Sequence, residues 1–391
     1  MVLQRIAPLL KNGDNTLSEQ RTNKRAVFKA RDKSHLECKL FLDESGGVDV
    51  VRDEVTNYPI FKKQAERMDS FIWKPTEINL QKDKVDFNER LEPHEQFIFT
   101  QTLLGNTAMD SLAGRGLAEC LLPIVSNSVV EACIFSITYF ENRIHAKSYR
   151  HIIESMYNDP SKVIDSIRET KAVLSKVKSI TRYYDDLIDF TQKYQQGLTH
   201  DLYTLKRKLY LFLHALNAME GIRFYGNFAS NFAFAESGRL IGNASILKLI
   251  ANDEAIHVAF STALIVRLPA DDDVYYRIAE ETLEECTGIY MQAVAQEWDW
   301  IEYLFQHGSM MGLNASILKS YVSERAYRCM KAVGLGPQYT GEIPLVASLP
   351  WMKSYLNEEN SQPAPQETEM TSYIKGADVD VTETTFSDFE L

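Results

Sequence analysis

The stretch ANDEAIH, at residues 251–257, decides how this chain can fold. Its Glu-x-x-His spacing places the carboxylate of Glu254 and the imidazole of His257 on one face of a helix. Glu220 lies upstream, and the turn signal Ser237-Gly238 falls almost midway between the two glutamates. If the two segments form an antiparallel hairpin, about seventeen residues out and about sixteen back return Glu254 to the height of Glu220.

The first half of the chain repeats this arrangement. Asp110 lies thirteen residues before Pro123, and SVVE at 128–131 predicts a capping box that opens a helix with Glu141 thirteen residues along it. His145 follows Glu141 by about one helical turn. A second hairpin therefore brings three more polar groups to a common level.

A carboxylate on an apolar helix face is costly unless it is paired or metal-bound, so four that converge in one core predict bound cations. A Glu from each of two helices and a Glu-x-x-His from each of two others is the pattern of ferritin-like di-iron and di-manganese bundles. We therefore predict an all-α, ferritin-like helical bundle with additional helices and a carboxylate-bridged two-metal site in its core. The predicted ligands are Asp110, Glu141, His145, Glu220, Glu254 and His257.

The first Glu-His pair departs from the pattern, because one extra residue separates Glu141 from His145. Residues at i and i+4 still share a helix face, so Glu141 can reach a metal together with His145. Asn142 holds the regular i,i+3 position, but an amide is a weaker, neutral ligand. The charge favours Glu141, and a local π-bulge could absorb the extra residue. Both alternatives stay open at this point.

The surroundings of the predicted ligands favour redox chemistry. Tyr149 follows His145 by one turn, on the same stripe of its helix. Apolar side chains one or two turns from the second-half glutamates point toward the same end of the site, namely Phe224, Phe228 and Ile250. We expect Tyr149 to lie in a dry pocket, which would exclude water from a reactive species.

Four motifs resemble one known family. They are MDSLAGR at 109–115, IHAKSY at 144–149, NAMEGIRFY at 217–225 and ANDEAIH at 251–257. Together they are similar to the radical-generating small subunit of class I ribonucleotide reductase, from about residue 41 to the last residue. The resemblance implies that the six predicted ligands hold two iron ions per chain. It also implies that Tyr149 is oxidised, with iron and oxygen, to a stable radical. A manganese or mixed pair would suit the same ligands.

The resemblance reaches beyond the bundle. FIWKP at 71–75 is similar to a family segment whose tryptophan, here Trp73, works with Asp253 in moving an electron to and from the cofactor. Tyr373 matches the tyrosine that relays the radical to a large subunit, and residues 386–391 resemble the C-terminal peptide that docks there. The resemblance thus implies a homodimer that works with a large subunit in deoxyribonucleotide synthesis.

Two other classes of protein remain as alternatives. A di-iron oxidase or an iron-storage bundle would use the same ligands, but it needs neither Tyr149 in the pocket nor an aromatic-anchored tail. A helical bundle that only binds other proteins would hold all six residues as ordinary polar groups. Stoichiometric metal binding would exclude that reading.

Residues that typically start or end helices predict the remaining helices of the body. Pro93 should open the Asp110 helix, and Asp159-Pro160 should start another. Helical periodicity continues through 272–305 and 315–333, and GLGP at 334–337 should end the helical body. Gly197 should break an earlier long helix.

Length and composition predict one main domain. The chain has 391 residues, 45% of them hydrophobic, and no evident internal duplication. We expect a partly disordered arm at 1–40, a di-metal domain at 41–356 and a flexible tail at 357–391 that docks on the large subunit.

Charge and hydropathy exclude other classes. A net charge of -12 argues against a general nucleic-acid binder. No run of eighteen apolar residues appears, and the N-terminus quickly becomes charged, so we expect a soluble, cytoplasmic protein with no membrane contact. The five cysteines have no metal-binding or redox spacing and are expected to be reduced thiols.

Overall fold

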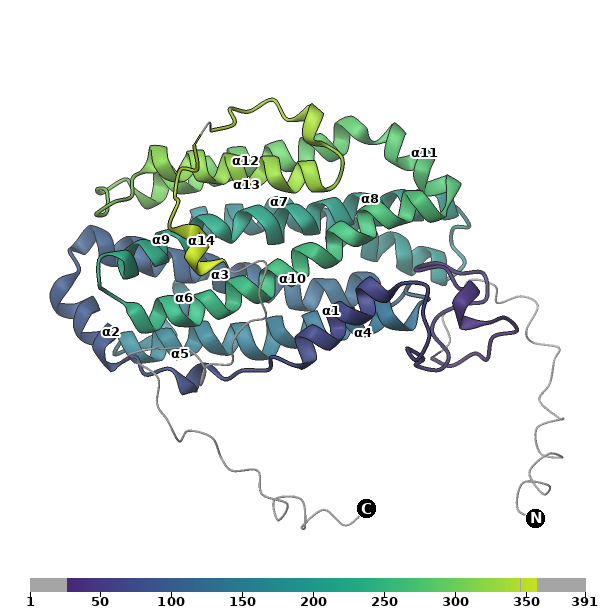
Figure 1. The fold of residues 1–391 in the computed structure, drawn as a ribbon, viewed down its shortest axis with the longest axis horizontal. Helices are drawn as coiled ribbons and strands as arrows, with labels where there is room; N and C mark the ends of the chain where they lie inside the picture. The colour runs from purple at the N-terminus through teal and green to yellow at the C-terminus, as the bar shows by residue number, and fades with distance from the viewer. Residues whose placement is uncertain (1–26, 345, 357–391) are drawn as a thin grey trace, which may run out of the picture.

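The computed structural model describes residues 27–344 and 346–356, which form a bundle of long helices running side by side (Figure 1). No strand forms among these residues, whose only β-pairings are two isolated bridges, Phe41 with Val125 and Met310 with Leu313. The helices of the body are α1 (Pro59–Asp69), α2 (Gln81–Val85), α3 (Pro93–Leu121), α4 (Ser128–Tyr139), α5 (Ala146–Met156), α6 (Pro160–Asp165), α7 (Lys171–Gln195), α8 (Leu202–Ala218), α9 (Tyr225–Glu236), α10 (Ile241–Asp271), α11 (Asp273–Glu281), α12 (Leu283–Leu304), α13 (Ala315–Ala332) and α14 (Met352–Tyr355). The predicted all-α fold is confirmed.

The first predicted hairpin is formed by α3 and by α4 with its continuation. Pro93 opens α3 as predicted, and the side chains of Glu92 and Glu95 cap its first turn reciprocally. The predicted cap of α4 is wrong by one residue. Asn127, not Ser128, accepts a hydrogen bond from a backbone N–H of the first turn, because Asn127 still has extended backbone geometry.

The second hairpin runs from α8 through α9 to α10, and the turn lies where the sequence predicts it. α9 ends at Glu236, and Gly238 has a φ of +72°. Such a left-handed residue is readily supplied by glycine after a helix. In Figure 1, α10 runs through the middle of the bundle, so its polar residues reach the core.

Two π-helical segments interrupt the hairpins. The segment η5 (Phe140–His145) joins α4 to α5, and the backbone N–H of Ala146 donates to the carbonyl oxygen of Glu141, five residues earlier. The segment η7 (Met219–Arg223) follows α8 directly and leads to α9. The π-bulge suggested for the first Glu-His pair is therefore present, and a second one occurs without a sequence signal.

Several outer helices begin or end where the sequence predicts. The side chain of Asp159 caps α6, Gly197 has a φ of +73° just after α7, and Gly334 has a φ of +83° just after α13. Figure 1 shows α12 and α13 lying together along one side of the bundle. From this side, α13 packs against η7.

Some predictions fall on residues outside the described ranges, including Tyr373 and the whole tail at 357–391. Of the predicted arm, residues 27–40 are described, and within them Cys38 and Leu40 are buried. Arg31 donates a hydrogen bond to the carbonyl oxygen of Ser126, at 2.7 Å. The division of the chain into arm, body and tail stays a prediction.

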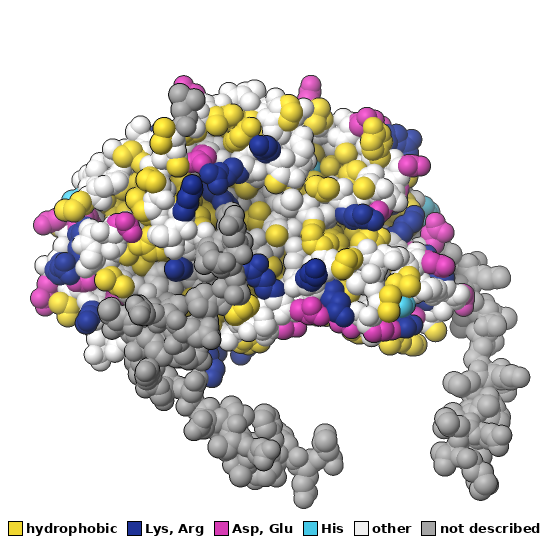
Figure 2. Space-filling model, in the orientation of Figure 1, with side chains coloured by type: hydrophobic (Ala, Val, Ile, Leu, Met, Phe, Trp, Pro, Cys, Tyr) yellow, Lys and Arg dark blue, Asp and Glu magenta, His cyan; other side chains and the backbone are white. Residues whose placement is uncertain are grey.

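One described helix, α10, is long and apolar enough to cross a membrane, but 67% of its apolar window is buried inside the protein. It is thus a core helix of the bundle. Figure 2 shows basic and acidic side chains interspersed with hydrophobic ones on the visible face. All five cysteines are buried free thiols, as predicted.

Candidate metal centre

Four helical elements bring the six predicted ligands together in the core. Asp110 comes from α3, Glu141 and His145 from η5, Glu220 from η7, and Glu254 and His257 from α10. Each of these side chains is at most 1% exposed. Their donor atoms form two overlapping groups, each within 4.8 Å, which are Asp110, Glu141, His145 and Glu254, and Glu141, Glu220, Glu254 and His257.

Two glutamates belong to both groups, Glu141 and Glu254. A carboxylate has two oxygens, so each of these residues can offer one oxygen to either group. The remaining members supply one carboxylate and one imidazole to each group. Such a set suits two adjacent divalent cations bridged by carboxylates.

The structure separates the two alternatives left open by the sequence. Glu141 is fully buried, and its Oε1 lies 3.2 Å from Nδ1 of His257. Asn142 is exposed and donates a hydrogen bond to the carbonyl oxygen of Thr138, at 3.0 Å. The π-helical geometry of η5 places Glu141 and His145 on the same side of the segment despite the extra residue. Asn142 therefore faces away from the centre.

Buried carboxylate oxygens outnumber the hydrogen-bond donors around them, which fits bound cations. In the described part of the chain, both oxygens of Asp110 and both of Glu141 are buried without an internal hydrogen bond of ordinary geometry. Burial raises the pKa of Asp110 well above its usual value, and the charge of Glu141 raises it further. Such a cluster is unfavourable by itself, and bound cations would offset its charge.

The histidines interact closely with the shared glutamates. Nδ1 of His257 lies 3.0 Å from Oε2 of Glu254, and Nδ1 of His145 lies 3.3 Å from Oε1 of the same residue. Burial opposes ionisation, but His257 and then His145 hold the pKa of Glu254 below its usual range. Both imidazoles thus direct a ring nitrogen at the carboxylates.

Trp73 and Asp253 form a chain that ends at this centre. Nε1 of Trp73 donates to Oδ2 of Asp253 at 3.0 Å, and Nε2 of His145 lies 3.1 Å from the same oxygen. All three side chains are buried. Trp73, which lies 180 residues before Asp253 in the sequence, is therefore linked through that carboxylate to the candidate ligand His145.

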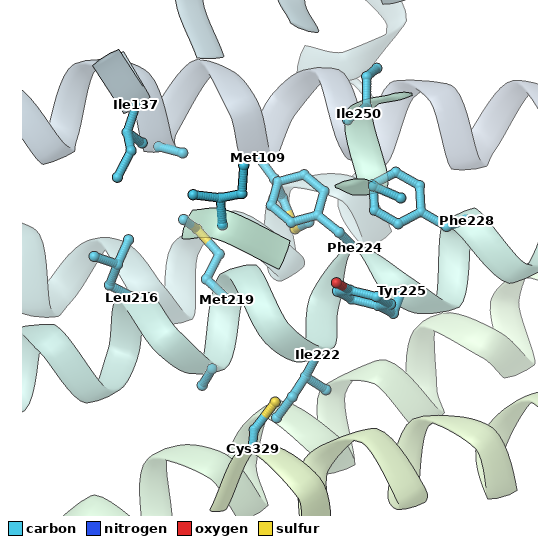
Figure 3. Packing of buried hydrophobic residues seen from close by; sticks show 14 of the residues in the cluster. Met109, Ile137, Leu216, Met219, Ile222, Phe224, Tyr225, Phe228, Ile250 and Cys329 are labelled. Atoms are coloured by element: carbon cyan, nitrogen blue, oxygen red, sulfur yellow. The ribbon is translucent and has the colours of Figure 1, made fainter. Parts of the chain in front are cut away.

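Tyr149 lies on α5 and is fully buried. Burial raises the pKa of Tyr149 well above its usual value, and the negative charges of Asp110 and Glu254 raise it further. The hydroxyl therefore stays protonated close to the carboxylate cluster. Phe224 and Phe228, whose ring centroids are 6.0 Å apart, are fully buried and lie near Ile250 (Figure 3).

Sequence reasoning missed a second buried tyrosine beside the centre. Burial raises the pKa of Tyr184 well above its usual value, and the charge of Glu220 raises it further. The hydroxyl of Tyr184 lies 3.9 Å from Sδ of Met219. Helical periodicity turns one member of the Tyr183-Tyr184 pair inward, but nothing in the sequence indicates which ring approaches the metal centre.

Comparisons with known proteins agree with this geometry. The sequence model of the family described as "Ribonucleotide reductase, small chain" matches residues 54–345. The chain is 40% identical over 359 residues to the ribonucleoside-diphosphate reductase 1 subunit beta of Escherichia coli O157:H7, covering 88% of this chain and 94% of that relative. It is 35% identical over 350 residues to the beta subunit of Enterobacteria phage T4, covering 84% and 89%.

Solved structures show the same fold. The ribonucleotide reductase R2 subunit from Clostridium botulinum superposes with a TM-score of 0.70 at 22% identity, covering 86% of this chain and 99% of that one. A dimanganese(II) protein from Streptococcus sanguinis gives a TM-score of 0.57 at 19% identity, covering 74% and 93%. The described body is thus ferritin-like, as predicted. The family match and the identity to these relatives together show that the chain belongs to the small-chain family of ribonucleotide reductases.

Proposed function

We propose that this chain is the radical-generating small subunit of a ribonucleoside-diphosphate reductase and that Tyr149 carries its radical. The observation that supports this most strongly is a fully buried tyrosine beside two overlapping ligand groups that share Glu141 and Glu254. The six predicted ligands would hold two iron ions, and a manganese or mixed pair fits the same donors. When bound, the metal pair supplies the oxygen-dependent oxidising chemistry.

Tyr149 gives up one electron and its phenolic proton in this proposal. Its raised pKa keeps the phenol protonated, so the proton must leave together with the electron. Among the carboxylates, Asp110 raises the pKa of this hydroxyl most through its charge. Asp110 is therefore the proposed acceptor of the proton. The apolar side chains of Phe224, Phe228 and Ile250 are proposed to keep water from the radical.

Trp73, Asp253 and His145 are proposed to conduct the electron to and from the centre. Asp253 accepts a hydrogen bond from Nε1 of Trp73 and contacts Nε2 of His145, so one carboxylate fixes both rings. Burial raises the pKa of Asp253, while the hydrogen bonds from His145 and Trp73 lower it. The three side chains are thus joined directly to one another through this carboxylate.

A small chain of this family implies a large partner subunit, in which the nucleotide is reduced. We propose that the tail at 357–391 docks on that subunit through residues 386–391 and that Tyr373 relays the radical. We also propose a cytoplasmic homodimer. Removing the last twenty residues should leave the radical intact and abolish turnover with the large subunit, whereas normal turnover would contradict the tail assignment.

The main test is a low-temperature electron paramagnetic resonance spectrum of metal-free protein that is loaded anaerobically with iron(II) and then exposed to oxygen. We expect two irons per chain and a tyrosyl doublet. Tyr149→Phe should keep both irons and lose the doublet. Tyr184→Phe is the matched control, because it changes the other buried tyrosine near the carboxylates. Two bound irons without a doublet in the unmodified protein would favour a di-iron oxidase instead.

A further inference from the structure

The segment η7 poses a structural question, because it carries Glu220 on an irregular turn inside the core. All five of its residues are buried. A π-helical turn is rare and is seen mostly as a single-turn bulge in an α-helix, often at a functional site. Surrounding residues must therefore stabilise it, and the contacts on the side away from the carboxylates identify them.

The closest of these contacts is between Gly221 and Cys329 of α13. A Cβ atom at position 221 would lie only 2.5 Å from Sγ of Cys329, a separation that real Cβ atoms essentially never show. The thiol also donates to the carbonyl oxygen of Gly221, at 3.6 Å. Figure 3 shows Cys329 reaching from α13 toward Ile222 of the same segment. The sulfur thus occupies the space that a side chain at 221 would need.

Arg325, one turn before Cys329 on α13, contacts the same peptide group. Its Nε donates to the carbonyl oxygen of Gly221 at 3.4 Å, and its guanidinium carbon lies 3.7 Å from the ring centroid of Tyr225. Two side chains of α13 therefore bind the carbonyl next to Glu220. The ring of Tyr225, just after the segment, is fixed by the same arginine.

The C-terminal end of η7 is bound from a different side. Nη1 of Arg223 donates to the carbonyl oxygen of Lys176 on α7 at 3.1 Å, and Nζ of Lys176 donates to the carbonyl oxygen of Arg223 at 3.2 Å. Lys176 also forms a buried ion pair with Glu297 of α12, at 2.7 Å. These contacts fix the end of the segment, whereas those from α13 act on the peptide beside the ligand.

We propose that Cys329 and Arg325 are positioning residues that hold η7 in its π-helical form and thereby direct the Glu220 carboxylate into its ligand group. The inference rests on the two-metal centre proposed above and extends it to a helix that supplies no ligand. Gly221 belongs to the same arrangement, since only a residue without a Cβ atom lets the Cys329 thiol approach the backbone at this position. The ligand group that contains Glu220 depends on this contact, and the group with Asp110 and His145 does not.

The test is a titration of metal-free protein with manganese(II). Electron paramagnetic resonance measures the free ion and the bound pair at each step. The unmodified protein should bind two ions per chain. Gly221→Ala should weaken one of the two sites at least about tenfold, the scale of effects from residues that orient ligands, and should weaken the pair spectrum. The Gly221→Ala, Cys329→Ala double variant should recover most of the lost affinity, because the sulfur is removed.

Gly288→Ala is the matched control, since the added Cβ of this helical glycine would meet no heavy atom within 4 Å beyond its chain neighbours and the backbone of its own helix. It should bind both ions like the unmodified protein. A merely structural role would lower the thermal stability of Gly221→Ala without changing the ratio of the two affinities. Unchanged binding in Gly221→Ala, or a loss that the double variant fails to recover, would overturn the role of Cys329.

If Gly221→Ala does not fold, the single variants Cys329→Ala and Arg325→Gln replace it. Each should weaken one site several-fold and leave the other unchanged, and normal binding by both variants would overturn the proposal. Manganese binding by the unmodified protein distinguishes a failure of this inference from a failure of the proposed function. If it binds no manganese, the two-metal centre itself is wrong, and the inference falls with it.

Discussion

Two of the π-helical segments in the described residues, η5 and η7, make the same contribution to the centre in different ways. Each supplies one glutamate, Glu141 or Glu220, to a buried cluster. In η5 the next two residues, Asn142 and Arg143, are exposed, whereas all five residues of η7 are buried. The first segment lies partly at the surface of the described body, and the second is enclosed by other helices.

This difference shows two origins of one backbone irregularity. The widened turn of η5 has a sequence signal, because Glu141 and His145 are four residues apart instead of three. The widened turn of η7 has none, and its support comes from α7 and α13. A π-bulge can thus be recognised from the spacing of its functional residues or imposed by the packing around it. The following experiments separate these two cases.

The largest effect should come from Glu141→Gln. This change removes a charged ligand that belongs to both groups, so we expect binding of at least one cation to weaken by about 100-fold or more. The measurement is iron(II) stoichiometry in anaerobic equilibrium dialysis. Two tightly bound irons in this variant would contradict the placement of Glu141 and would remove the functional reason for the η5 bulge.

The next effect concerns stability in acid. It involves a buried histidine on α8, the helix that leads into η7. His214 of α8 is 1% exposed, with Nδ1 3.3 Å from the hydroxyl of Tyr290 and its ring 4.8 Å from that of Tyr210. Burial lowers the pKa of His214 to about 3. Between pH 6.5 and 3 the unfolded chain therefore binds a proton that the folded chain does not, and stability falls as the pH falls.

The expected loss is up to about 1.4 kcal/mol of unfolding free energy per pH unit, or about 2–3 kcal/mol between pH 6 and pH 4. Urea unfolding of metal-free protein at several pH values measures it. His214→Gln lacks the titrating ring and should show a shallower dependence. Parallel curves for the two proteins would show that the unfolding of the α8–η7 region is not linked to this proton.

A smaller effect is expected from Gly114→Ala, which tests the packing of η5 against α3. A Cβ at position 114 would lie 2.5 Å from Nδ2 of Asn142 and 2.8 Å from Cβ of Glu141. The latter atom is attached directly to the backbone, so the segment must shift, and we expect a destabilisation of about 1–3 kcal/mol. Urea unfolding is the measurement, with Gly288→Ala as control. Equal midpoints would mean that η5 adapts freely.

The smallest effect should come from Asn142→Ala. This exposed side chain contributes a hydrogen bond to the carbonyl oxygen of Thr138, so its loss should change stability by less than about 0.5 kcal/mol. Iron stoichiometry should stay at that of the unmodified protein. A large loss of iron binding here, with normal binding in Glu141→Gln, would reverse the assignment of the two neighbours.

Much of the site could be predicted because its signals are local. Glu254 and His257 share one helix, and the turn at Ser237-Gly238 sets the height at which Glu220 meets them. Glycine or proline also predicted the starts of α3 and α6 and the ends of α7, α9 and α13. The predicted cap at Ser128 was wrong because two adjacent residues, Asn127 and Ser128, can both cap a helix, and only the backbone geometry chooses between them.

The sequence by itself determined the all-α bundle, the two hairpins and the set of six candidate ligands, since helix periodicity and turn residues act over a few positions. Only the tertiary structure decided that Glu141 faces the cluster, that Asp253 also contacts His145, and that Cys329 packs on Gly221. Side-chain direction at such positions depends on the local widening of a helix. That widening is stabilised by contacts with helices far away in the chain, which no local pattern records.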